Sequence, residues 1–303
     1  MIIAIASGKG GTGKTTVATS LALSLPHRPL TFLDCDVEEP NAALFLRPTI
    51  ETQERVGVLV PEIIAERCTY CGRCAEVCRY HAIAVVGQQV LVFREMCHGC
   101  GSCALNCPTQ AIREVVNHFG SIELGHAGEI AFGQGILDVG QPLAPPIIRQ
   151  LKRQALTPAR REGVVIIDAS PGTSCPVVES LRGADVALLV TEPTPFGLHD
   201  LRLAVEVARD ELGLPVGVVI NRAAARGAAV RGADAGDDGV ERFCAEQGVP
   251  VWLRIPLDRR IAEAYSEGLP LVRALPRYKD QFLEMYQQMM KHLAASRVLR
   301  GVP

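Results

Sequence analysis

Short apolar runs separated by amphipathic stretches make up most of the 303-residue chain. The first run, Ile2–Ala6, precedes a glycine-rich loop and a stretch of helical composition, Lys14–Leu25, that stops at Pro26. The runs are almost continuously apolar, as expected for parallel strands that are buried on both faces of a sheet. Five later runs of this kind are Leu30–Asp36, Gly163–Gly172, Asp185–Pro193, Pro215–Arg222 and Val249–Pro256.

Helical patterns occupy the intervals between these runs. Strands that alternate with helices predict an α/β fold with a doubly wound, mostly parallel sheet. The segment Arg231–Gly239 is rich in Gly and Asp, and we expect it to be a mobile surface loop. The predicted helices are Cys175–Leu181, Gly197–Leu212, Val240–Gln247, Arg259–Glu267 and Arg277–Val298.

Two similar cysteine-rich blocks interrupt this alternation. CTYCGRCAEVCRYHAI occupies Cys68–Ile83, and CHGCGSCALNCPTQAI occupies Cys97–Ile112, with every cysteine displaced by 29 positions. Apolar runs on both sides of Gly87-Gln88 predict a hairpin between the blocks. The blocks therefore form an internal repeat of one small unit.

The repeat predicts two structural units. We expect a small α+β module at residues 55–116, inserted into a larger domain formed by residues 1–54 and 117–303. Residues 117–146 are rich in Gly and Pro, and their pattern predicts no individual helix or strand. We expect this segment to lead the chain back to the sheet.

Composition narrows the classes of function. A net charge of −2 provides no general basic surface for phosphates, so no nucleic-acid partner is expected. No apolar run reaches the length of about 18 residues that indicates a membrane span, and the short first run lacks the flanks of a signal peptide. We therefore expect a cytoplasmic protein without membrane association. In that reducing compartment the eleven cysteines are not expected to form disulfides, and the eight cysteines in the blocks indicate metal binding.

The glycine-rich loop GKGGTGKTT fits the phosphate-binding pattern G-x-x-x-x-G-K-[ST]. Its glycines let backbone N–H groups surround phosphate oxygens, and the helix that follows points its positive end at the anion. Lys14 is expected to neutralise the β- and γ-phosphates, and the Thr15 hydroxyl is expected to bind Mg²⁺. The predicted ATP or ADP contacts in this loop are Gly8, Lys9, Gly10, Gly11, Thr12, Gly13, Lys14, Thr15 and Thr16.

The spacing C-x₂-C-x₂-C-x₃-C occurs in both blocks and matches the bacterial ferredoxin arrangement for two [4Fe–4S] clusters, in which the fourth cysteine of each run serves the other cluster. Paired zinc sites, or the loss of one cluster, remain alternatives. Arg79 follows Cys78 where Pro108 follows Cys107, which places a positive charge near one cluster. The predicted ligand sets are Cys68, Cys71, Cys74 and Cys107 for one cluster and Cys97, Cys100, Cys103 and Cys78 for the other.

The stretch KGGTGKT resembles the deviant Walker A motif of the family that contains MinD, ParA and the nitrogenase iron protein. The resemblance implies that Lys9 reaches the phosphates of the partner in a nucleotide-sandwich homodimer. In DCDVEEPN, it implies that Asp36 positions the attacking water. In IIDASPGTS, it implies that Asp168 is linked to Mg²⁺ and that Gly172 turns its N–H toward the γ-phosphate.

The resemblance extends to the base of the nucleotide and to a further cysteine. In INR, Asn221 and the adjacent Arg222 match the place where the family binds the adenine edge, and Pro256 of RIPLD matches the loop beside the base. Cys35, Cys175 and Cys244 are expected to be small buried residues. The resemblance to the nitrogenase iron protein implies an alternative for Cys175, in which it binds a cluster that is shared between two subunits.

The chain as a whole resembles MinD-like P-loop ATPases with an inserted ferredoxin domain. This implies a homodimeric Mg²⁺-dependent ATPase whose nucleotide state moves the two-cluster module. The favoured function of this coupling between ATP and the clusters is ATP-gated electron transfer to an unidentified redox partner. The alternatives are an ATPase that carries or assembles an iron–sulfur or other metal cofactor, with a cofactor-assembly partner, and a cell-positioning ATPase with structural clusters.

Overall fold

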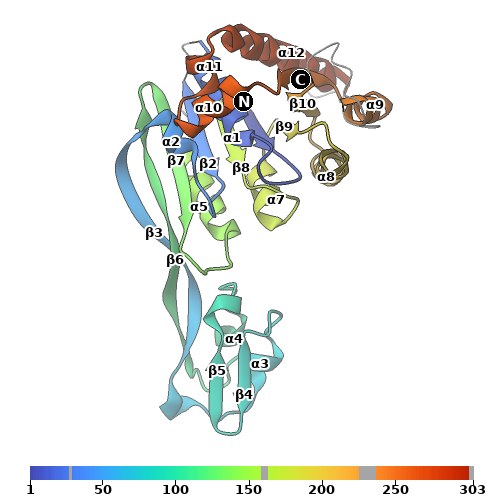
Figure 1. Ribbon diagram of the computed structural model, residues 1–303. Helices are drawn as coiled ribbons and strands as arrows, with labels where there is room; N and C mark the ends of the chain where they lie inside the picture. Colours follow the sequence, from blue (N-terminus) through green and yellow to red (C-terminus); the bar gives the residue numbers. More distant parts are fainter. Residues whose placement is uncertain (27–28, 158–162, 225–236, 300–303) are drawn as a thin grey trace.

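A nine-stranded sheet forms the centre of the larger part of the molecule (Figure 1). The computed structural model describes residues 1–26, 29–157, 163–224 and 237–299. Seven strands pair in parallel, in the order β11-β10-β9-β1-β8-β2-β7, and β6 and β3 continue the sheet in antiparallel orientation. This confirms the predicted mostly parallel sheet. The parallel strands are β1 (Ile2–Ala6), β2 (Leu30–Cys35), β7 (Ile130–Leu137), β8 (Val164–Ala169), β9 (Val186–Thr191), β10 (Val216–Ala223) and β11 (Val251–Pro256).

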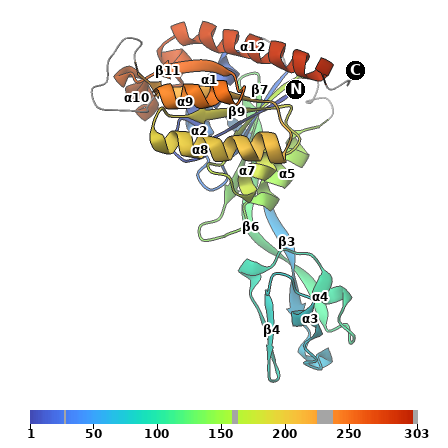
Figure 2. The same ribbon diagram turned by 90° about the vertical axis from the view of Figure 1, so that its right-hand side faces the viewer.

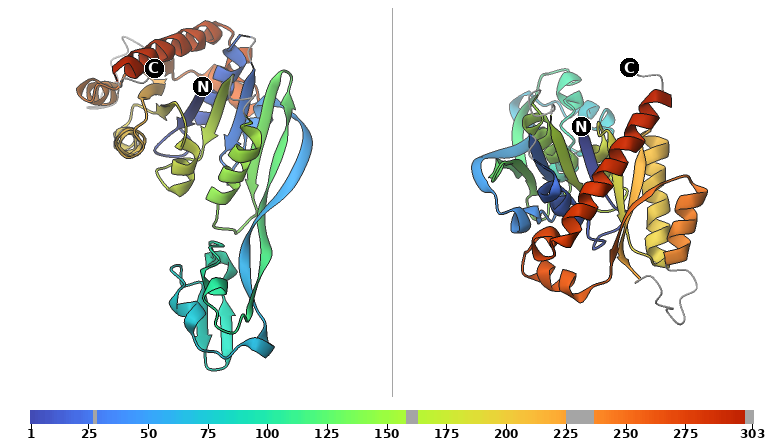
Figure 3. Two further views of the ribbon diagram at one scale, coloured as in Figure 1. Left: turned by 180° about the vertical axis from the view of Figure 1, so that it is seen from behind. Right: turned by 90° about the horizontal axis from the view of Figure 1, so that it is seen from above.

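Helices cover both faces of this sheet, because successive apolar residues of each strand point to opposite sides. In β1, Ala4 belongs to the core cluster that contains residues of α5, α7, α8 and α9, whereas Ile3 and Ile5 belong to the cluster that contains residues of α1, α11 and α12. Figure 2 shows α12 on one side and α5, α7 and α8 on the other, and Figure 3 shows α12 running across its face. The helices are α1 (Lys14–Ser24), α2 (Ala42–Leu46), α5 (Pro145–Ala155), α7 (Cys175–Leu181), α8 (Pro195–Val205), α9 (Asp237–Glu246), α10 (Arg259–Ser266), α11 (Leu271–Ala274) and α12 (Arg277–Leu299).

Two predicted segments differ from the structure. The helix expected from Gly197 begins two residues earlier, where Thr194 caps it by accepting the Gly197 N–H at 2.9 Å, and its last turns form a π-helix, η3 (Glu206–Glu211). Of the predicted loop Arg231–Gly239, residues 231–236 lie outside the described part, and the remaining three begin α9.

A two-stranded antiparallel ribbon connects the large sheet to the cysteine-rich module. It consists of β3 (Thr49–Ile63) and β6 (Ile112–Ala127), which pair from Thr49 with His126 to Ile63 with Ile112, with register shifts after Ile50 and after Val56. β7 supports β6 only from Gly120 onward, so residues 57–63 and 112–118 extend beyond the sheet. At about 3.3 Å per residue, this free part is about 23 Å long. The predicted boundaries at 54/55 and 116/117 fall inside these strands.

The ribbon has a β-bulge at the point where it leaves the sheet. Val56 pairs with Gly120 and Gly57 pairs with His118, so the intervening Phe119 has no partner across the ribbon. Phe119 is buried in the core, and its carbonyl accepts the Asp138 N–H at 2.9 Å. Bulges bend and twist a ribbon locally, and this one fixes the direction in which the module projects.

The module beyond the ribbon contains the predicted hairpin and two short helices. The hairpin strands are paired from Ile83 with Val92 to Val86 with Gln89. In the described part of the chain, no helix is long and apolar enough to span a membrane. The elements of the module are η1 (Ala65–Arg67), α3 (Arg73–Glu76), β4 (Ile83–Val86), β5 (Gln89–Val92), η2 (Arg94–Met96) and α4 (Ser102–Leu105).

Candidate functional site

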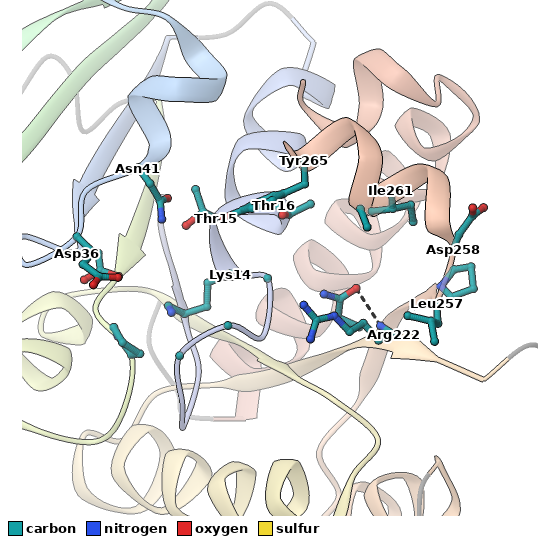
Figure 4. A pocket seen from close by; sticks show the side chains of 18 residues that line it. Lys14, Thr15, Thr16, Asp36, Asn41, Arg222, Leu257, Asp258, Ile261 and Tyr265 are labelled. Atoms are coloured by element: carbon teal, nitrogen blue, oxygen red, sulfur yellow. Dashed lines mark hydrogen bonds between the residues drawn. The ribbon is translucent and has the colours of Figure 1, made fainter. Parts of the chain in front are cut away.

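A pocket of about 330 Å³ opens at the carboxyl ends of the central strands (Figure 4). This is where open α/β sheets bind their ligands. Ten of the predicted nucleotide and catalytic residues line it: Gly10, Gly11, Gly13, Lys14, Thr15, Thr16, Asp36, Asn221, Arg222 and Pro256. Eight lining residues were not predicted individually, although two of them belong to the RIPLD stretch expected beside the base: Glu39, Asn41, Pro171, Leu257, Asp258, Ile261, Ala262 and Tyr265.

The two ends of the pocket differ in chemistry (Figure 4). Asp36 and Asn41 lie at one end, on the side toward which Lys14 points. Leu257 and Ile261 lie at the other end, together with the charged side chains of Arg222 and Asp258. A polar end with a lysine suits a triphosphate, and an end that combines apolar and polar side chains suits a purine ring with its polar edge.

The phosphate-binding loop is held by contacts with neighbouring elements. Asn221 was predicted to contact adenine, but its Nδ2 donates to the Thr12 carbonyl at 2.7 Å, so it fastens the loop to β10. Gly8 is required by close packing, because a Cβ there would lie 2.2 Å from the carbonyl oxygen of Asp200 in α8. These contacts shape the loop before any phosphate binds.

Asp168 fits a magnesium-linked carboxylate. It ends β8 with 1% of its surface exposed, and neither oxygen has a hydrogen bond of normal geometry to the described residues. Burial raises its pKa to about 6, and the nearby Thr15 hydroxyl and Lys14 ammonium oppose that rise. Mg²⁺ is commonly held by one or two protein groups plus substrate phosphates, so Asp168 and Thr15 suit this ion.

Asp36 lies near Lys14 in a partly buried position. Burial raises its pKa to about 7, with further increases from Asp168, Glu38 and Glu39, while Lys14 lowers it. A carboxylate with a pKa near neutrality is suited to hold and orient a water molecule.

The loop that carries Asp36 is organised by Asp34, a role that was not predicted. The fully buried Asp34 carboxylate accepts the backbone N–H groups of Asp36, Asn41 and Ala42 at 3.1, 3.0 and 2.9 Å. Burial is the main cause that raises its pKa. The sequence signal was available, since DCD places a second acid at the end of the same strand.

Gly8, Lys9, Thr12, Asp168 and Gly172 do not line the pocket. The Gly172 N–H donates to the Ser7 carbonyl at 2.9 Å, so the expectation that it points toward a γ-phosphate is wrong for this conformation. Lys9 forms an ion pair of 3.4 Å with Glu192 of its own chain, and Arg222 pairs with the same carboxylate.

The cysteine blocks form two small cavities in the module. We call the first the proximal cavity; it is lined by Leu59, Pro61 and Glu114 of the ribbon. We call the second the distal cavity; it is lined by Ile63 and Ile112 at the end of the ribbon. Each cavity takes three cysteines from one block and the fourth from the other, as in the predicted ligand sets. The proximal cavity contains Cys97, Cys100, Cys103 and Cys78, and the distal cavity contains Cys68, Cys71, Cys74 and Cys107.

The backbone around the two cavities repeats with the same 29-residue shift. Helix α3 corresponds to α4, and the left-handed Gly72 and Gly101, with φ of 81° and 72°, begin these helices. The Ala82 N–H donates to Cys78 Sγ at 3.3 Å, and the Ala111 N–H donates to Cys107 Sγ at 3.2 Å. Sulfur-directed N–H groups stabilise thiolates that are bound to iron.

Within the described ranges, no three His, Cys, Asp or Glu side chains converge on a point where they could hold one metal ion. A cubane does not require such convergence, because each thiolate binds a different iron. The remaining cysteines differ from one another: Cys35 and Cys244 are buried, as expected, but Cys175 is exposed at the start of α7, so its predicted burial is wrong.

Comparisons with known proteins agree with the nucleotide pocket. Residues 3–271 match the family described as the CobQ/CobB/MinD/ParA nucleotide binding domain. An uncharacterised protein of Methanocaldococcus jannaschii is 37% identical over 210 residues, or 68% of this chain and 72% of the relative. A Pyrococcus horikoshii protein named iron-sulfur cluster carrier protein is 26% identical over 304 residues, or 96% and 86%. The structure of MinD from P. horikoshii with Mg-ADP has a similar fold, with a TM-score of 0.55, 20% identity and 95% of both chains covered.

Proposed function

This chain belongs to the CobQ/CobB/MinD/ParA family of nucleotide-binding proteins, and on that premise we propose that its ATPase cycle controls electron transfer through a module with two [4Fe–4S] clusters. The observation that carries the proposal is the pair of four-cysteine cavities at the end of a ribbon that leaves the sheet at the same edge as the nucleotide pocket.

The nucleotide pocket supplies the groups that a Mg²⁺-dependent ATPase needs. Lys14 neutralises charge on the β- and γ-phosphates, and Thr15 and Asp168 hold Mg²⁺ when the nucleotide is bound. Asp36 orients the attacking water, while Asn221 keeps the loop in its binding conformation through Thr12. Phosphoryl transfer depends mainly on such positioning and on charge stabilisation.

The cysteine cavities fit iron–sulfur clusters that stay in the protein. Four thiolates from two blocks surround each cavity, and the N–H groups of Ala82 and Ala111 are directed at sulfur. When bound, the clusters supply one-electron redox chemistry. Because each site uses cysteines of both blocks, release of one cluster would disturb the ligands of both sites, which favours retention.

The structure offers a continuous connection between the pocket and the module. The loop with Asp36 leads through α2 directly into β3, the first strand of the ribbon. In the same loop, the Val37 carbonyl accepts the Leu137 N–H at 2.8 Å, and Leu137 pairs with Gly120 of β6. Both strands of the ribbon are therefore tied to the loop that would respond to the γ-phosphate, as in other nucleotide switches.

The proposal includes an ATP-dependent homodimer. Lys9 lies outside its own pocket and has 34% of its side chain exposed, so it is accessible to a second protomer. In that dimer, Lys9 would leave Glu192 and contact the phosphates bound by the partner.

A second candidate function is the transfer of iron–sulfur clusters to other proteins. Two Pyrococcus relatives of 26% and 25% identity bear the name iron-sulfur cluster carrier protein. Their name favours a function in which the module holds clusters that are delivered to other proteins. In that case the clusters would leave the cysteine cavities during the cycle.

One experiment tests the proposal and separates the two candidates. Protein purified without oxygen should contain about eight iron and eight sulfide per chain. In an Asp36→Asn variant that hydrolyses ATP slowly, the cluster reduction potentials should differ between Mg-ATP and Mg-ADP while the iron content stays constant. Equal potentials would contradict nucleotide control of electron transfer. Loss of iron to an apo-acceptor protein would support the carrier.

A further inference from the structure

The two cysteine cavities are related by the internal repeat, but their walls carry different charges. Position 114 corresponds to position 85 through the 29-residue shift, and these positions are Glu114 in the proximal cavity and Val85 in the distal cavity. A carboxylate on β6 of the ribbon therefore occupies the place that an aliphatic side chain occupies in β4.

The Glu114 carboxylate lies directly against the loop that bears the proximal cysteines. A Cβ added to Gly101 would be 3.4 Å from Glu114 Oε1 and 4.0 Å from Oε2, and Gly101 lies between Cys100 and Cys103. Among the described residues, no cation pairs with this carboxylate. Its negative charge is therefore balanced only by solvent.

The distal cavity has a positively charged side chain where the proximal cavity has a neutral one. Arg73 lines it, whereas the corresponding residue of the proximal cavity is the neutral Ser102. Arg73 Nη1 pairs with Glu76 at 2.8 Å, which weakens its positive charge but does not reverse it. The distal site is thus the less negative of the two.

Three other features bear on the cluster potentials. The N–H bonds to Cys78 and Cys107 differ by 0.1 Å, from 3.3 to 3.2 Å, so they do not distinguish the sites. In the distal site the Thr109 hydroxyl also lies 3.8 Å from Cys107 Sγ, and a donor to that sulfur acts in the same direction as the charge difference. Arg79 is exposed, as Glu114 is, but Arg79 does not line the proximal cavity. Among the described residues, Glu114 is the one acid that lines either cavity.

We infer that Glu114 makes the proximal site the lower-potential one, so that reduction of the module populates the distal site first; this rests on the proposed two-cluster function. Reduction of a [4Fe–4S] site from 2+ to 1+ adds one negative charge, which a nearby carboxylate opposes. An electron delivered to the proximal site by a low-potential one-electron donor protein would pass to the distal site, so that the proximal site would return from 1+ to 2+ and the distal site would go from 2+ to 1+.

The placement of the higher-potential site gives the electron a direction. The distal cavity is at the end of the ribbon, beyond the proximal cavity and farther from the ATPase sheet. The electron therefore rests at the free end of the module, where an acceptor protein can approach without contacting the ATPase domain.

The test is a reductive titration of the full-length protein with both clusters, followed by electron paramagnetic resonance. Wild-type protein should show two midpoint potentials. Glu114→Gln should raise the lower one and leave the higher one in place, and Glu114→Lys should raise it further. Glu95→Gln is the matched control, because Glu95 is exposed on η2 in the same repeat and lines neither cavity.

The possible results separate this inference from the proposed function. Two intact clusters whose lower potential does not move in Glu114→Gln, or whose higher potential moves instead, would overturn the assignment alone. The same shift in Glu95→Gln would also overturn it, since it would show a general charge effect. A chain that binds fewer than two clusters without oxygen refutes the proposed function together with the assignment.

Discussion

Replacement of Asp168 by asparagine should stabilise the nucleotide-free protein and remove its response to Mg²⁺. The Asp168 carboxylate is buried at the end of β8 without a hydrogen bond of normal geometry to the described residues. The fully buried Asp34 lies nearby, and the Asp168 charge contributes to the rise in the Asp34 pKa. An amide of the same shape removes a buried negative charge that Lys14 and Thr15 compensate only in part and that the bound metal would neutralise.

The magnitude follows from the pKa of Asp168. Its rise from 3.8 to about 6 is worth about 3 kcal/mol at about 1.4 kcal/mol per unit. Because the folded pKa lies above the unfolded one, the folded state holds more protons between these values, and stability falls as pH rises from about 4 to about 6. The penalty is complete at pH 8 and absent below about pH 4.

The assay is thermal unfolding with EDTA and without nucleotide, at pH 4.5 and pH 8. Asp168→Asn should unfold at a higher temperature than wild type at pH 8, by about 6 °C if each kcal/mol shifts the midpoint by about 2 °C in a chain of this size. The difference should shrink at pH 4.5. Mg-ATP should raise the midpoint of wild type but not that of the variant.

Glu284→Gln provides the control, because Glu284 is an exposed carboxylate on α12. It should leave the midpoint unchanged at both pH values. The reasoning fails if Asp168→Asn is less stable than wild type at pH 8, or if its advantage is the same at pH 4.5. Either result would mean that the carboxylate is compensated in the free protein.

Four other substitutions test the pocket. Lys14→Ala should abolish nucleotide binding in a fluorescent-nucleotide titration. Lys9→Ala should bind nucleotide normally but should not dimerise with ATP in a sedimentation experiment. A Lys9→Ala protein that dimerises like wild type would refute the role of Lys9 in the partner's pocket. Asn221→Ala leaves the Thr12 carbonyl unpaired, which costs about 1–3 kcal/mol, so nucleotide affinity should fall about tenfold or more, and unchanged affinity would contradict this role. Gly8→Ala should lower the unfolding temperature through its clash with α8, and a neutral effect would show that the helix can move.

The sequence predicted the groups that are close together along the chain. The phosphate-binding loop and the two cysteine blocks each depend on residues within a short stretch, and their spacing alone indicates the chemistry. The alternation of strands and helices likewise predicted the parallel sheet. The sequence also predicted that Cys78 and Cys107 each contribute to the cavity of the other block, because the repeat keeps the spacing of the ferredoxin pattern.

Contacts between distant segments were missed for a physical reason. Asn41 and Tyr265 line one pocket but lie far apart in the sequence, before α2 and in α10, and only the strand order brings them together. The first half of β3, Thr49–Arg55, is an edge strand with every side chain exposed, so it lacks the burial pattern that identifies a strand. Segment 117–146 was unassigned because β6 and β7 contain glycines where side chains would collide, such as Gly133.

The length of the ribbon determines how ATP could act on the clusters. Over about 23 Å of water, one unit charge contributes about 0.2 kcal/mol before screening, and the Debye length of about 8 Å at physiological salt reduces that more than tenfold. The γ-phosphate charge therefore cannot shift a cluster potential directly. A shift between Mg-ATP and Mg-ADP must pass through the ribbon, so it should stay constant when salt is raised from about 50 to about 300 mM. A shift that vanishes with salt would show that the effect is electrostatic and that the ribbon is only a tether.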